Sequence, residues 1–482
     1  MMPASTANWS ARERSKIAPA AELLIENLDV VMPYIPNTDD DRRNMLQRIG
    51  VGSFEELLAG MPDGLRLKKP LDIPSLSELE LLREIRSLAG TSREGLVCFA
   101  GGGVYDHFIP AAVATIISRP EFVTAYTPYQ AEVAQGTLQV IYEFQSHICR
   151  LTGMDVTNAS MYDGATAAAE AMVLATKVTK KSKVIVSETV NPLYREVIAT
   201  YLAGRGAELA VAAVKDGLTD TERIKEMADD RTAAVLVSQP NFFGLLEDVE
   251  AVSDIVHGVG GKLIMSVDPI AQAILRTPAD YGADIVVGEG QPLGNPVSFG
   301  GPLLGFFAAR KELARSMPGR IVARTTDVDG NPGFVLTLQT REQHIRREKA
   351  TSNICTNQAL CATAASVYLT LLGRKGLKQV ALLAAERAQQ TARKIFELDG
   401  YEPYFKAPFV REFAVRTPRP AREIVLAMVE RGVIPGIDAG RWFRTLGDCL
   451  IVAVTEKRTG QEVARLVEGL KELSSSGVLS RM

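Results

Sequence analysis

The chain has 482 residues, of which 46% are hydrophobic and 23% charged, which is ordinary usage for a globular protein and excludes a disordered or fibrous class. A single hydrophobic core rarely grows beyond roughly 250–300 residues, so we expect two or three domains. The 54 basic and 57 acidic residues give a net charge of -3 without a dense basic run, so nucleic acid is not an expected partner.

Nothing in the sequence predicts a membrane span or a secretory signal. The longest apolar stretches, such as 303–309, are far shorter than the ~20 residues that cross a bilayer, so no membrane is expected as a partner. Residues 1–31 are polar and lack the apolar core of a signal peptide. We predict there a disordered N-terminal extension outside the fold, and an upstream start of the chain is the alternative.

The cysteine pattern bears on the cellular compartment. The five cysteines are Cys98, Cys149, Cys355, Cys361 and Cys449. An odd, scattered set without a CxxC pair fits a reducing compartment better than a disulfide or zinc framework. We therefore predict a cytoplasmic protein without a metal site.

Residues 32–92 are predicted to form an N-terminal helical arm. Apolar residues recur at helical spacing from about residue 38 and again in a Leu and Ile series at 76–88. Pro70 and Pro74 interrupt the pattern, because proline lacks the backbone donor that a helix interior needs.

Residues 93–345 are predicted to form a large α/β domain. Short β-branched runs alternate there with amphipathic helical stretches such as 221–230 and 248–260. This rhythm is typical of a mainly parallel sheet with helices on both faces, in which ligands bind beyond the carboxyl ends of the strands. The predicted strands are 183–188, 207–214, 232–239, 262–268 and 284–289.

Residues 346–482 are predicted to form a smaller C-terminal α+β domain. Thr459 precedes the last apolar helical face and is expected to cap that helix. The predicted elements are helices at 356–373, 376–398 and 460–473 and strands at 411–417 and 449–456.

Together these parts match the layout of the fold-type-I pyridoxal-phosphate-dependent transferases, an α/β class. That layout has a large domain with a mainly parallel central sheet, a small C-terminal α+β domain and an N-terminal helical arm. Fold alone does not define a function. Enzymes of this fold need an aspartate for the pyridine nitrogen of the cofactor, a helix N-terminus for its phosphate and a lysine for the Schiff base.

Two of these three groups have candidates, which we expect to mark a vestigial cofactor site. Asp268 ends the strand 262–268, where the pyridine partner usually lies; an aspartate bound to nearby backbone is the alternative. Gly164 and Thr166 open an Ala-rich helix whose N-terminus suits a phosphate. Asp163 favours a different role for that helix end, because a capping carboxylate stabilises the helix and repels a phosphate.

The third group, the lysine, is missing. The loop after 284–289 reads EGQPLGNPVSFGGPLLGF. Lys262 starts the preceding strand, at the wrong end of the sheet, and Lys311 lies beyond a further strand. Without an amine no Schiff base forms, so we expect no covalent cofactor on this chain. The loop's Gly and Pro content suits tight turns and the close approach of another backbone, and a purely structural loop is the alternative.

Several long stretches resemble the glycine dehydrogenase (decarboxylating) family, the P-protein of the glycine cleavage system. The most specific are TPYQAEVAQG at 127–136 and TREQHIRREKATSNICT at 340–356, and the likeness runs from Met32 essentially to the C-terminus. Some members carry two similar halves in one chain, and others divide them into subunits 1 and 2. The stretches here are similar to the N-terminal half, hence to subunit 1.

The resemblance implies that the cofactor lysine, and with it pyridoxal phosphate, belongs to subunit 2. The two subunits together would decarboxylate glycine and transfer the remaining aminomethyl group to the lipoyl group of the H-protein. The expected partners are therefore glycine dehydrogenase subunit 2 and the lipoylated H-protein.

Sites of this fold lie at an interface between two chains, so a chain without the lysine still shapes a pocket. The interface candidates, from the loops 101–110 and 124–130, are Tyr105, His107, Tyr126, Thr127 and Tyr129. Their hydroxyls and imidazole can orient a small carboxylate or a phosphate, and His107 is a candidate proton donor near neutral pH. A structural role is the alternative for each of them.

Two other functions stay open from the sequence. One is a non-catalytic scaffold that stabilises the cofactor-bearing partner or docks the H-protein. The other is an autonomous pyridoxal-phosphate decarboxylase or lyase that uses an unexpected lysine.

Overall fold

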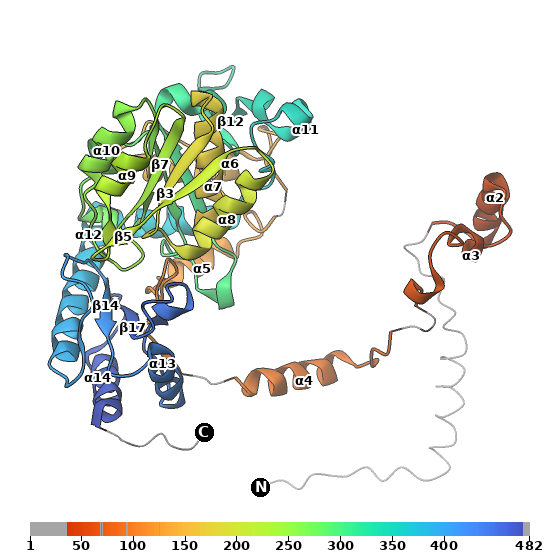
Figure 1. Ribbon diagram of the computed structural model, residues 1–482. Helices are drawn as coiled ribbons and strands as arrows, with labels where there is room; N and C mark the ends of the chain where they lie inside the picture. Colours follow the sequence, from red (N-terminus) through yellow and green to blue (C-terminus); the bar gives the residue numbers. More distant parts are fainter. Residues whose placement is uncertain (1–35, 68, 70, 93–94, 125, 476–482) are drawn as a thin grey trace, which may run out of the picture. The chain divides into compact units, whose positions relative to one another are not determined.

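A computed structural model describes residues 36–67, 69, 71–92, 95–124 and 126–475 (Figure 1). The predicted extension at 1–31 lies outside these residues. The chain divides into two compact units, Met1–Thr91 and Ser92–Met482. Among the described residues, no helix is both long and apolar enough to cross a membrane.

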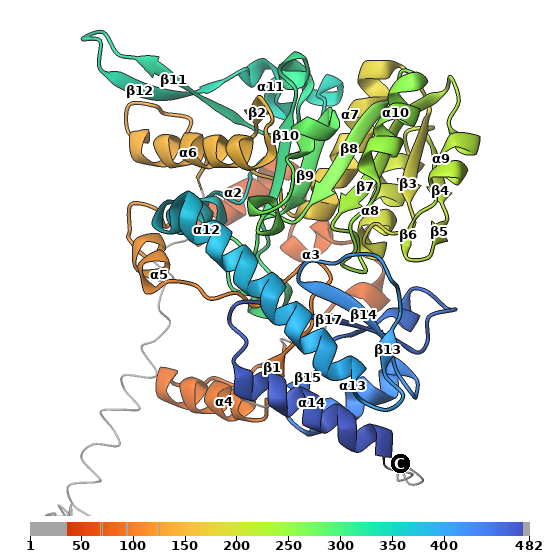
Figure 2. The same ribbon diagram turned by 90° about the vertical axis from the view of Figure 1, so that its left-hand side faces the viewer.

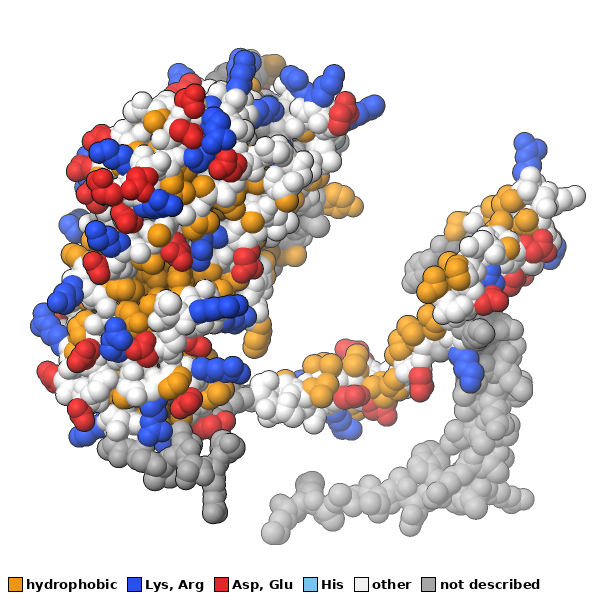
Figure 3. Space-filling model, viewed as in Figure 1, with side chains coloured by type: hydrophobic (Ala, Val, Ile, Leu, Met, Phe, Trp, Pro, Cys, Tyr) orange, Lys and Arg blue, Asp and Glu red, His pale blue; other side chains and the backbone are white. Residues whose placement is uncertain are grey.

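The first unit contains the helices α2 (Asp39–Ile49), α3 (Phe54–Leu57) and α4 (Glu78–Gly90). Capping boxes fix the starts of α2 and α4, at Thr38 and Ser77. None of these three helices buries a side chain. Figure 3 shows hydrophobic side chains exposed along them. The helices of this unit therefore lack a hydrophobic core of their own.

The second unit is built on a seven-stranded sheet in the order β2-β10-β9-β8-β7-β3-β4. Strands β9, β8, β7, β3 and β4 run parallel, and β10 runs antiparallel to both of its neighbours. The mainly parallel sheet predicted from the sequence is confirmed, with strand ends shifted by at most two residues. The bounds are β2 (Val156–Thr157), β3 (Lys183–Ser187), β4 (Glu208–Ala212), β7 (Thr232–Gln239), β8 (Lys262–Val267), β9 (Ile285–Glu289) and β10 (Gly305–Ala309).

Helices cover both faces of this sheet (Figures 1 and 2). Val184, Val186 and Leu236 belong to the core with α7 (Gly164–Thr179) and α8 (Pro192–Ala203). Ile185, Val235 and Val237 belong to the core of the other face. Since both faces are buried, the strands read as continuous apolar runs. The helices that contribute to that core are α5 (Ala111–Ile117), α6 (Gln135–Thr152), α9 (Thr221–Met227), α10 (Val249–Gly258) and α12 (Ala359–Phe396).

The two helices predicted at 356–373 and 376–398 are the two parts of α12, which meet at a non-helical kink at Gly373. Gly373 has φ 57° and ψ -173°, a conformation that glycine adopts without the steric cost of a side chain. The first part of α12 packs on the large sheet and on α6, and the second part packs in the C-terminal core. The helix thus serves both cores.

The C-terminal part contains a four-stranded antiparallel sheet in the order β13-β14-β17-β16. Thr459 caps the last helix as predicted, because its Oγ1 accepts the N–H of Glu462 at 3.2 Å. β1 (Val97–Cys98), in the range predicted for the large domain, pairs with β15 (Val433–Ile434). The other bounds are β13 (Glu402–Pro403), β14 (Glu412–Arg416), β16 (Ile437–Asp438), β17 (Cys449–Ala453), α13 (Ala421–Glu430) and α14 (Gly460–Ser475).

Candidate active site

A small cavity of about 60 Å³ lies between the carboxyl ends of the parallel strands and the C-terminal sheet. Asp268 lines it from the end of β8, Glu289 from the end of β9, and Arg411 and Glu412 from the start of β14. Sites for cofactor-sized ligands usually have volumes of roughly 300–1,000 Å³. The cavity therefore has room for a few water molecules and not for a cofactor.

Asp268, the predicted partner of a pyridine nitrogen, is bound by groups of its own chain. Its Oδ1 accepts the N–H groups of Ile270 at 2.9 Å and Ala271 at 3.3 Å. Its Oδ2 lies 2.5 Å from Nη2 of Arg411, and the two side chains are 13% and 3% exposed. The bonding to nearby backbone that the sequence left as an alternative is thus present, together with a buried ion pair. A guanidinium occupies the place that a protonated pyridine nitrogen would need.

His107 lies between Arg411 and Glu456. Its Nδ1 is 2.6 Å from Oε2 of Glu456, and its Nε2 contacts Nη1 of Arg411. Arginine only donates, so Nε2 accepts and the ring proton lies on Nδ1, directed at Glu456. Burial and the neighbouring Arg411 lower the pKa of His107, against the opposing effect of Glu456. The imidazole is therefore neutral at neutral pH.

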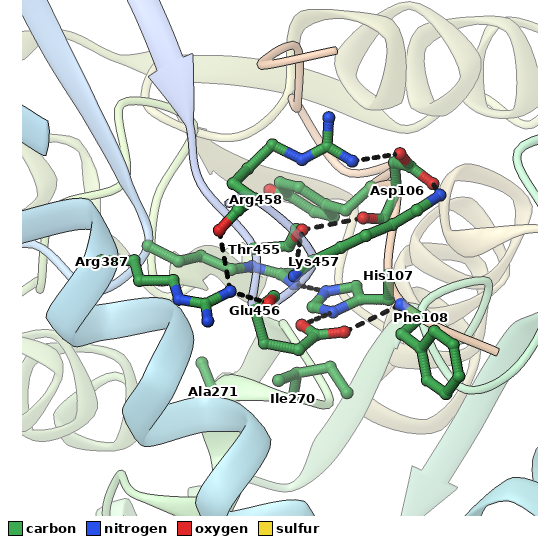
Figure 4. Close-up of polar contacts among 12 residues, drawn as sticks. Asp106, His107, Phe108, Ile270, Ala271, Arg387, Thr455, Glu456, Lys457 and Arg458 are labelled. Carbon is green, nitrogen blue, oxygen red and sulfur yellow. Dashed lines mark hydrogen bonds and ion pairs between the residues drawn. The ribbon is translucent and has the colours of Figure 1, made fainter. Parts of the chain in front are cut away.

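The segment that carries His107 is tied to the C-terminal part of the chain (Figure 4). Asp106 pairs with Lys457 at 2.7 Å and with Arg458 at 2.8 Å. The N–H of Phe108 donates to Oε1 of Glu456 at 2.8 Å. These contacts hold residues 106–108 against residues 456–458, so the loop before them has a fixed position over the cavity.

Tyr105 completes the network around Arg411. Its hydroxyl donates to Oε2 of Glu412 at 2.8 Å, and the guanidinium of Arg411 lies 3.6 Å from the centre of its ring. The N–H of Gly102 donates to the other oxygen of Glu412 at 2.8 Å. Burial raises the pKa of Tyr105 and raises that of Glu412 to about 7. The side chains of Tyr105 and Glu412 therefore bond to groups of their own chain.

The N-terminus of α7, the predicted phosphate site, is occupied by carboxylates. Asp163 is the N-cap, and its Oδ1 accepts the N–H of Thr166 at 2.7 Å, so the capping role weighed in the sequence is present. The N–H of Gly164 donates to Oε2 of Glu289 at 3.0 Å. Glu289 also accepts the N–H groups of Gln291 at 2.9 Å and Leu304 at 2.8 Å. Burial nevertheless raises the pKa of Glu289 to about 7.

These residues do not fit pyridoxal phosphate. Asp268 is paired with Arg411, and Asp163 and Glu289 bind the amides that a phosphate would need. β9 ends on Glu289, and the residues that line the cavity include no lysine. The cofactor site typical of this fold is filled by the chain's own side chains.

Tyr129 lies in a second place together with Arg320, Glu342 and His344, and we call these four residues the Tyr129 cluster. Tyr126 and Thr127 precede Tyr129 on the same loop. The hydroxyl of Tyr129 accepts from Nη2 of Arg320 at 2.9 Å and donates to Oε2 of Glu342 at 3.3 Å. Arg320 and Glu342 also form a buried ion pair at 3.4 Å. The Tyr129 ring packs edge-on against His344, with 5.5 Å between ring centres.

The Tyr129 cluster joins stretches that are far apart in the sequence. Tyr129 and Glu342 come from the two stretches that carry the family resemblance most specifically, 127–136 and 340–356. The side chains of Tyr126 and Tyr129 are 88% and 45% exposed. A cavity of about 400 Å³, lined by Glu342 and His344 among others, adjoins the cluster. The cluster therefore exposes Tyr129 and His344 at an open surface, while its charged pair of Arg320 and Glu342 is buried.

The structure brings Tyr105, His107 and Asp268 together around Arg411, which the sequence analysis missed. It also missed Glu289 and Glu412. Carboxylates inside predicted apolar strands were the available signal for these two, because a buried charge needs a partner. No local pattern marks Arg411, since its partners come from other elements of the fold.

The chain has the fold of the fold-type-I pyridoxal-phosphate-dependent transferases. Its mainly parallel sheet is covered by helices on both faces, and a long helix joins this sheet to a small α+β part. The sphingosine-1-phosphate lyase of Burkholderia pseudomallei superposes with a TM-score of 0.61 at 15% identity, over 86% of this chain and 93% of the lyase. That likeness shows the fold alone.

The chain belongs to the family described as "Glycine cleavage system P-protein", whose sequence profile matches residues 32–470. The "Probable glycine dehydrogenase (decarboxylating) subunit 1" of Carboxydothermus hydrogenoformans is 52% identical over 91% of this chain and 99% of its own. The protein of that name in Chloroherpeton thalassium is 50% identical, over 92% of this chain and 100% of its own. A crystal structure of a glycine decarboxylase (P-protein) in inhibitor-bound form superposes with a TM-score of 0.81 at 41% identity, over 92% of this chain and 100% of that one.

Proposed function

We propose that the chain is subunit 1 of a two-subunit glycine decarboxylase. With a lysine-bearing subunit 2, it decarboxylates glycine and passes the aminomethyl group to the lipoyl group of the H-protein. Relatives named subunit 1, at 50–52% identity over nearly the whole chain, support this function. The main observation behind this proposed function is that side chains of this chain fill the cavity around Asp268 and Arg411. A chain whose own side chains fill the cofactor site depends on the cofactor site of a partner.

In this proposal pyridoxal phosphate belongs to subunit 2, and the Tyr129 cluster is the contribution of this chain. Tyr126 and Tyr129 are exposed and Thr127 is half-buried, so these residues can line a neighbouring chain's pocket for a small carboxylate. Arg320 and Glu342 hold Tyr129 in position. We propose that this surface faces the active site of subunit 2.

Tyr105 and His107 contribute differently, because both are buried and bound within their own chain. Their contacts support a positioning role for the Arg411 network. Direct participation of these two side chains at the interface stays a prediction from the sequence.

The apolar side chains of the first unit are a physical argument for a partner chain. Within its own unit, helix α4 buries none of Leu79, Leu82 and Ile85, and full burial of such a side chain is worth about 1.5–3 kcal/mol. We propose that α4 packs against subunit 2. The double variant L82E/I85E is expected to lose co-purification with subunit 2, whereas R86E, a charge change on the same exposed helix, is expected to keep it.

The function is tested by assaying the purified chain alone and with subunit 2. Release of carbon dioxide from glycine, with lipoylated H-protein as acceptor, is expected only when both subunits are present. The chain alone with added pyridoxal phosphate is expected to show no borohydride-reducible absorption band near the visible edge. Such a band on the isolated chain would instead establish an autonomous enzyme.

The second candidate function is a scaffold without an active-site role. It is favoured by the hydrogen bonds that Tyr105 and His107 form within their own chain. It predicts unchanged turnover when the Tyr129 cluster is altered in an intact complex. A cytoplasmic location stays a prediction from the cysteine pattern, and the five cysteines are all free.

A further inference from the structure

A third and larger cavity, of about 700 Å³, lies between α6, the kink of α12 and the segment after β8. We call it the kink cavity. Figure 2 shows α6 and the upper part of α12 side by side, and the two helices pack against each other. The kink cavity shares no lining residue with the cavity around Asp268. Its volume lies within the roughly 300–1,000 Å³ that is usual for small-molecule sites.

The charges in the lining of the kink cavity are all basic. Arg150 comes from α6, and Arg374 and Lys378 come from α12 just after the kink. No Asp or Glu lines the cavity, and within the described part of the chain none of these three side chains forms an ion pair. Cations gathered in a cleft repel one another and attract an anion.

His147 adds a hydrogen-bonding group at the same wall. Its Nε2 lies 3.4 Å from Oγ1 of Thr370, which also lines the cavity. Burial lowers the pKa of His147, and Arg150 lowers it further, against the opposing effect of Glu143. The ring is therefore neutral at neutral pH and can donate to a ligand without its own charge.

The side-chain amide of Gln272 in the lining has no hydrogen-bond partner among the described residues. This side chain lines the cavity and is 5% exposed, and neither its Nε2 nor its Oε1 has a hydrogen-bond partner among the described residues. A buried polar group without a partner costs about 1–3 kcal/mol. Each of the two atoms exposes less than 1 Å², so a ligand with donor and acceptor atoms would satisfy the amide once the side chain turns toward the cavity.

The kink supplies the shape of the site. At Gly373 the helix turns out of its regular path, and Leu369 before the kink and Leu377 after it line the same cavity as Arg374. Leu151 of α6 adds to this apolar wall. The lining therefore combines an apolar surface for a ring with arginine and lysine groups that suit a phosphate.

We propose that the kink cavity binds a small phosphate-bearing molecule of nucleotide size. The permanent cations Arg150, Arg374 and Lys378 hold the phosphate groups, and Gln272 bonds to polar atoms of the remaining part. This site is independent of the glycine reaction, because it uses none of the residues around Asp268 or Tyr129.

Isothermal titration of the complex with subunit 2 tests the proposal, with ADP, adenosine and citrate as probes. ADP is expected to bind, and adenosine, which lacks phosphate, to bind at least about 100-fold more weakly. R374Q and K378Q are each expected to weaken ADP binding about tenfold, and raised salt to weaken it further. R393Q removes the same charge from an exposed position of the same helix and is the matched control, with unchanged ADP binding.

Three results would overturn the proposal. They are no measurable binding of ADP, equal binding of ADP by the R374Q/K378Q double variant, and tighter binding of citrate than of ADP. Q272L tests the amide separately, and ADP binding about tenfold weaker than in the unmodified chain is expected for it. Since Arg374 and Lys378 form no ion pairs among the described residues, their variants are expected to fold even if Q272L does not.

Discussion

The guanidinium of Arg411 lies 2.5 Å from the carboxylate of Asp268, and the two side chains are 3% and 13% exposed. The pair joins the carboxyl end of β8 in the large sheet to the residue before β14 in the C-terminal sheet. In a fold that uses this aspartate to hold a cofactor, the pair closes the site with an internal cation. It also makes the two parts of the chain depend on each other for charge neutrality.

Replacing Arg411 with Met is expected to lower the free energy of unfolding by about 3–5 kcal/mol, because it leaves Asp268 buried without its counter-charge. The midpoint and slope of urea unfolding measure this. The control is Arg416→Gln on β14, whose pair with Asp448 at 2.8 Å has side chains 45% and 37% exposed. That change is expected to cost at most about 1 kcal/mol.

The double variant Asp268→Leu with Arg411→Met is expected to recover most of the loss, because it removes both charges together. Equal costs for Arg411→Met and Arg416→Gln would contradict the dependence on burial.

Gly164→Ala is expected to lower the free energy of unfolding by about 1–3 kcal/mol through overpacking. A Cβ at Gly164 would contact the hydroxyl of Tyr194 and lie 3.1 Å from the backbone nitrogen of Glu289. Gly136→Ala in α6 is the control, because a Cβ there meets nothing within 4 Å. It is expected to stabilise the chain by about 0.5–1 kcal/mol, as alanine does in a helix. If Gly164→Ala and Gly136→Ala both lowered the free energy of unfolding, steric overlap of the added Cβ would not be the cause.

The strands were predictable because a sheet buried on both faces imposes continuous apolar runs, as in β7 and β8. The positions of Asp268 and of the helix after Asp163 followed from the same regularity. The break between the helices predicted at 356–373 and 376–398 was predictable in the same way, because Gly373 takes up the non-helical φ and ψ between the two helical parts of α12.

The candidate site was only partly predictable. Tyr105 and His107 were found from their loop, but their bonding through Arg411 depends on how two sheets meet, which local patterns do not encode. The same limit applies to Tyr129, whose partners Arg320 and Glu342 lie far along the chain. The sequence analysis named residues of both groups without separating them into two places.

Glu289 is expected to make stability depend on pH. Its pKa of about 7 in the folded chain lies above the ordinary value of 4.5, so the folded state retains a proton that the unfolded state has lost. Stability from this group is therefore complete below about pH 4.5 and is lost as pH rises through 7, by about 3 kcal/mol in all. Burial is the main cause, and the nearby Asp163 adds to it.

Glu289→Gln is expected to flatten the fall in unfolding free energy between pH 5 and pH 8, since an amide does not titrate in that range. Urea unfolding at a series of pH values provides the measurement. Glu121→Gln, at an exposed carboxylate, is the control and is expected to leave the slope unchanged. A slope equally steep in Glu289→Gln would assign the titration to other groups, such as Glu412.

Tyr129→Phe is expected to reduce kcat/KM for glycine by about 10–100-fold in the complex with subunit 2. The change removes one hydroxyl and keeps the ring against His344 and the ion pair of Arg320 with Glu342. The hydroxyl bonds to the charged side chains of Arg320 and Glu342, and a hydrogen bond to a charged group is worth about 1.5–3 kcal/mol, which corresponds to that loss when turnover depends on this arrangement.

The matched control for this change is Tyr142→Phe. The Tyr142 ring packs against Phe334 at 5.3 Å between centres, and its hydroxyl makes no hydrogen bond to a described residue. Turnover and co-purification with subunit 2 are expected to be unchanged in Tyr142→Phe. If Tyr129→Phe also turned over at the full rate in an intact complex, this chain would act as a scaffold, because its most exposed set of family-specific hydroxyls would not contribute to catalysis.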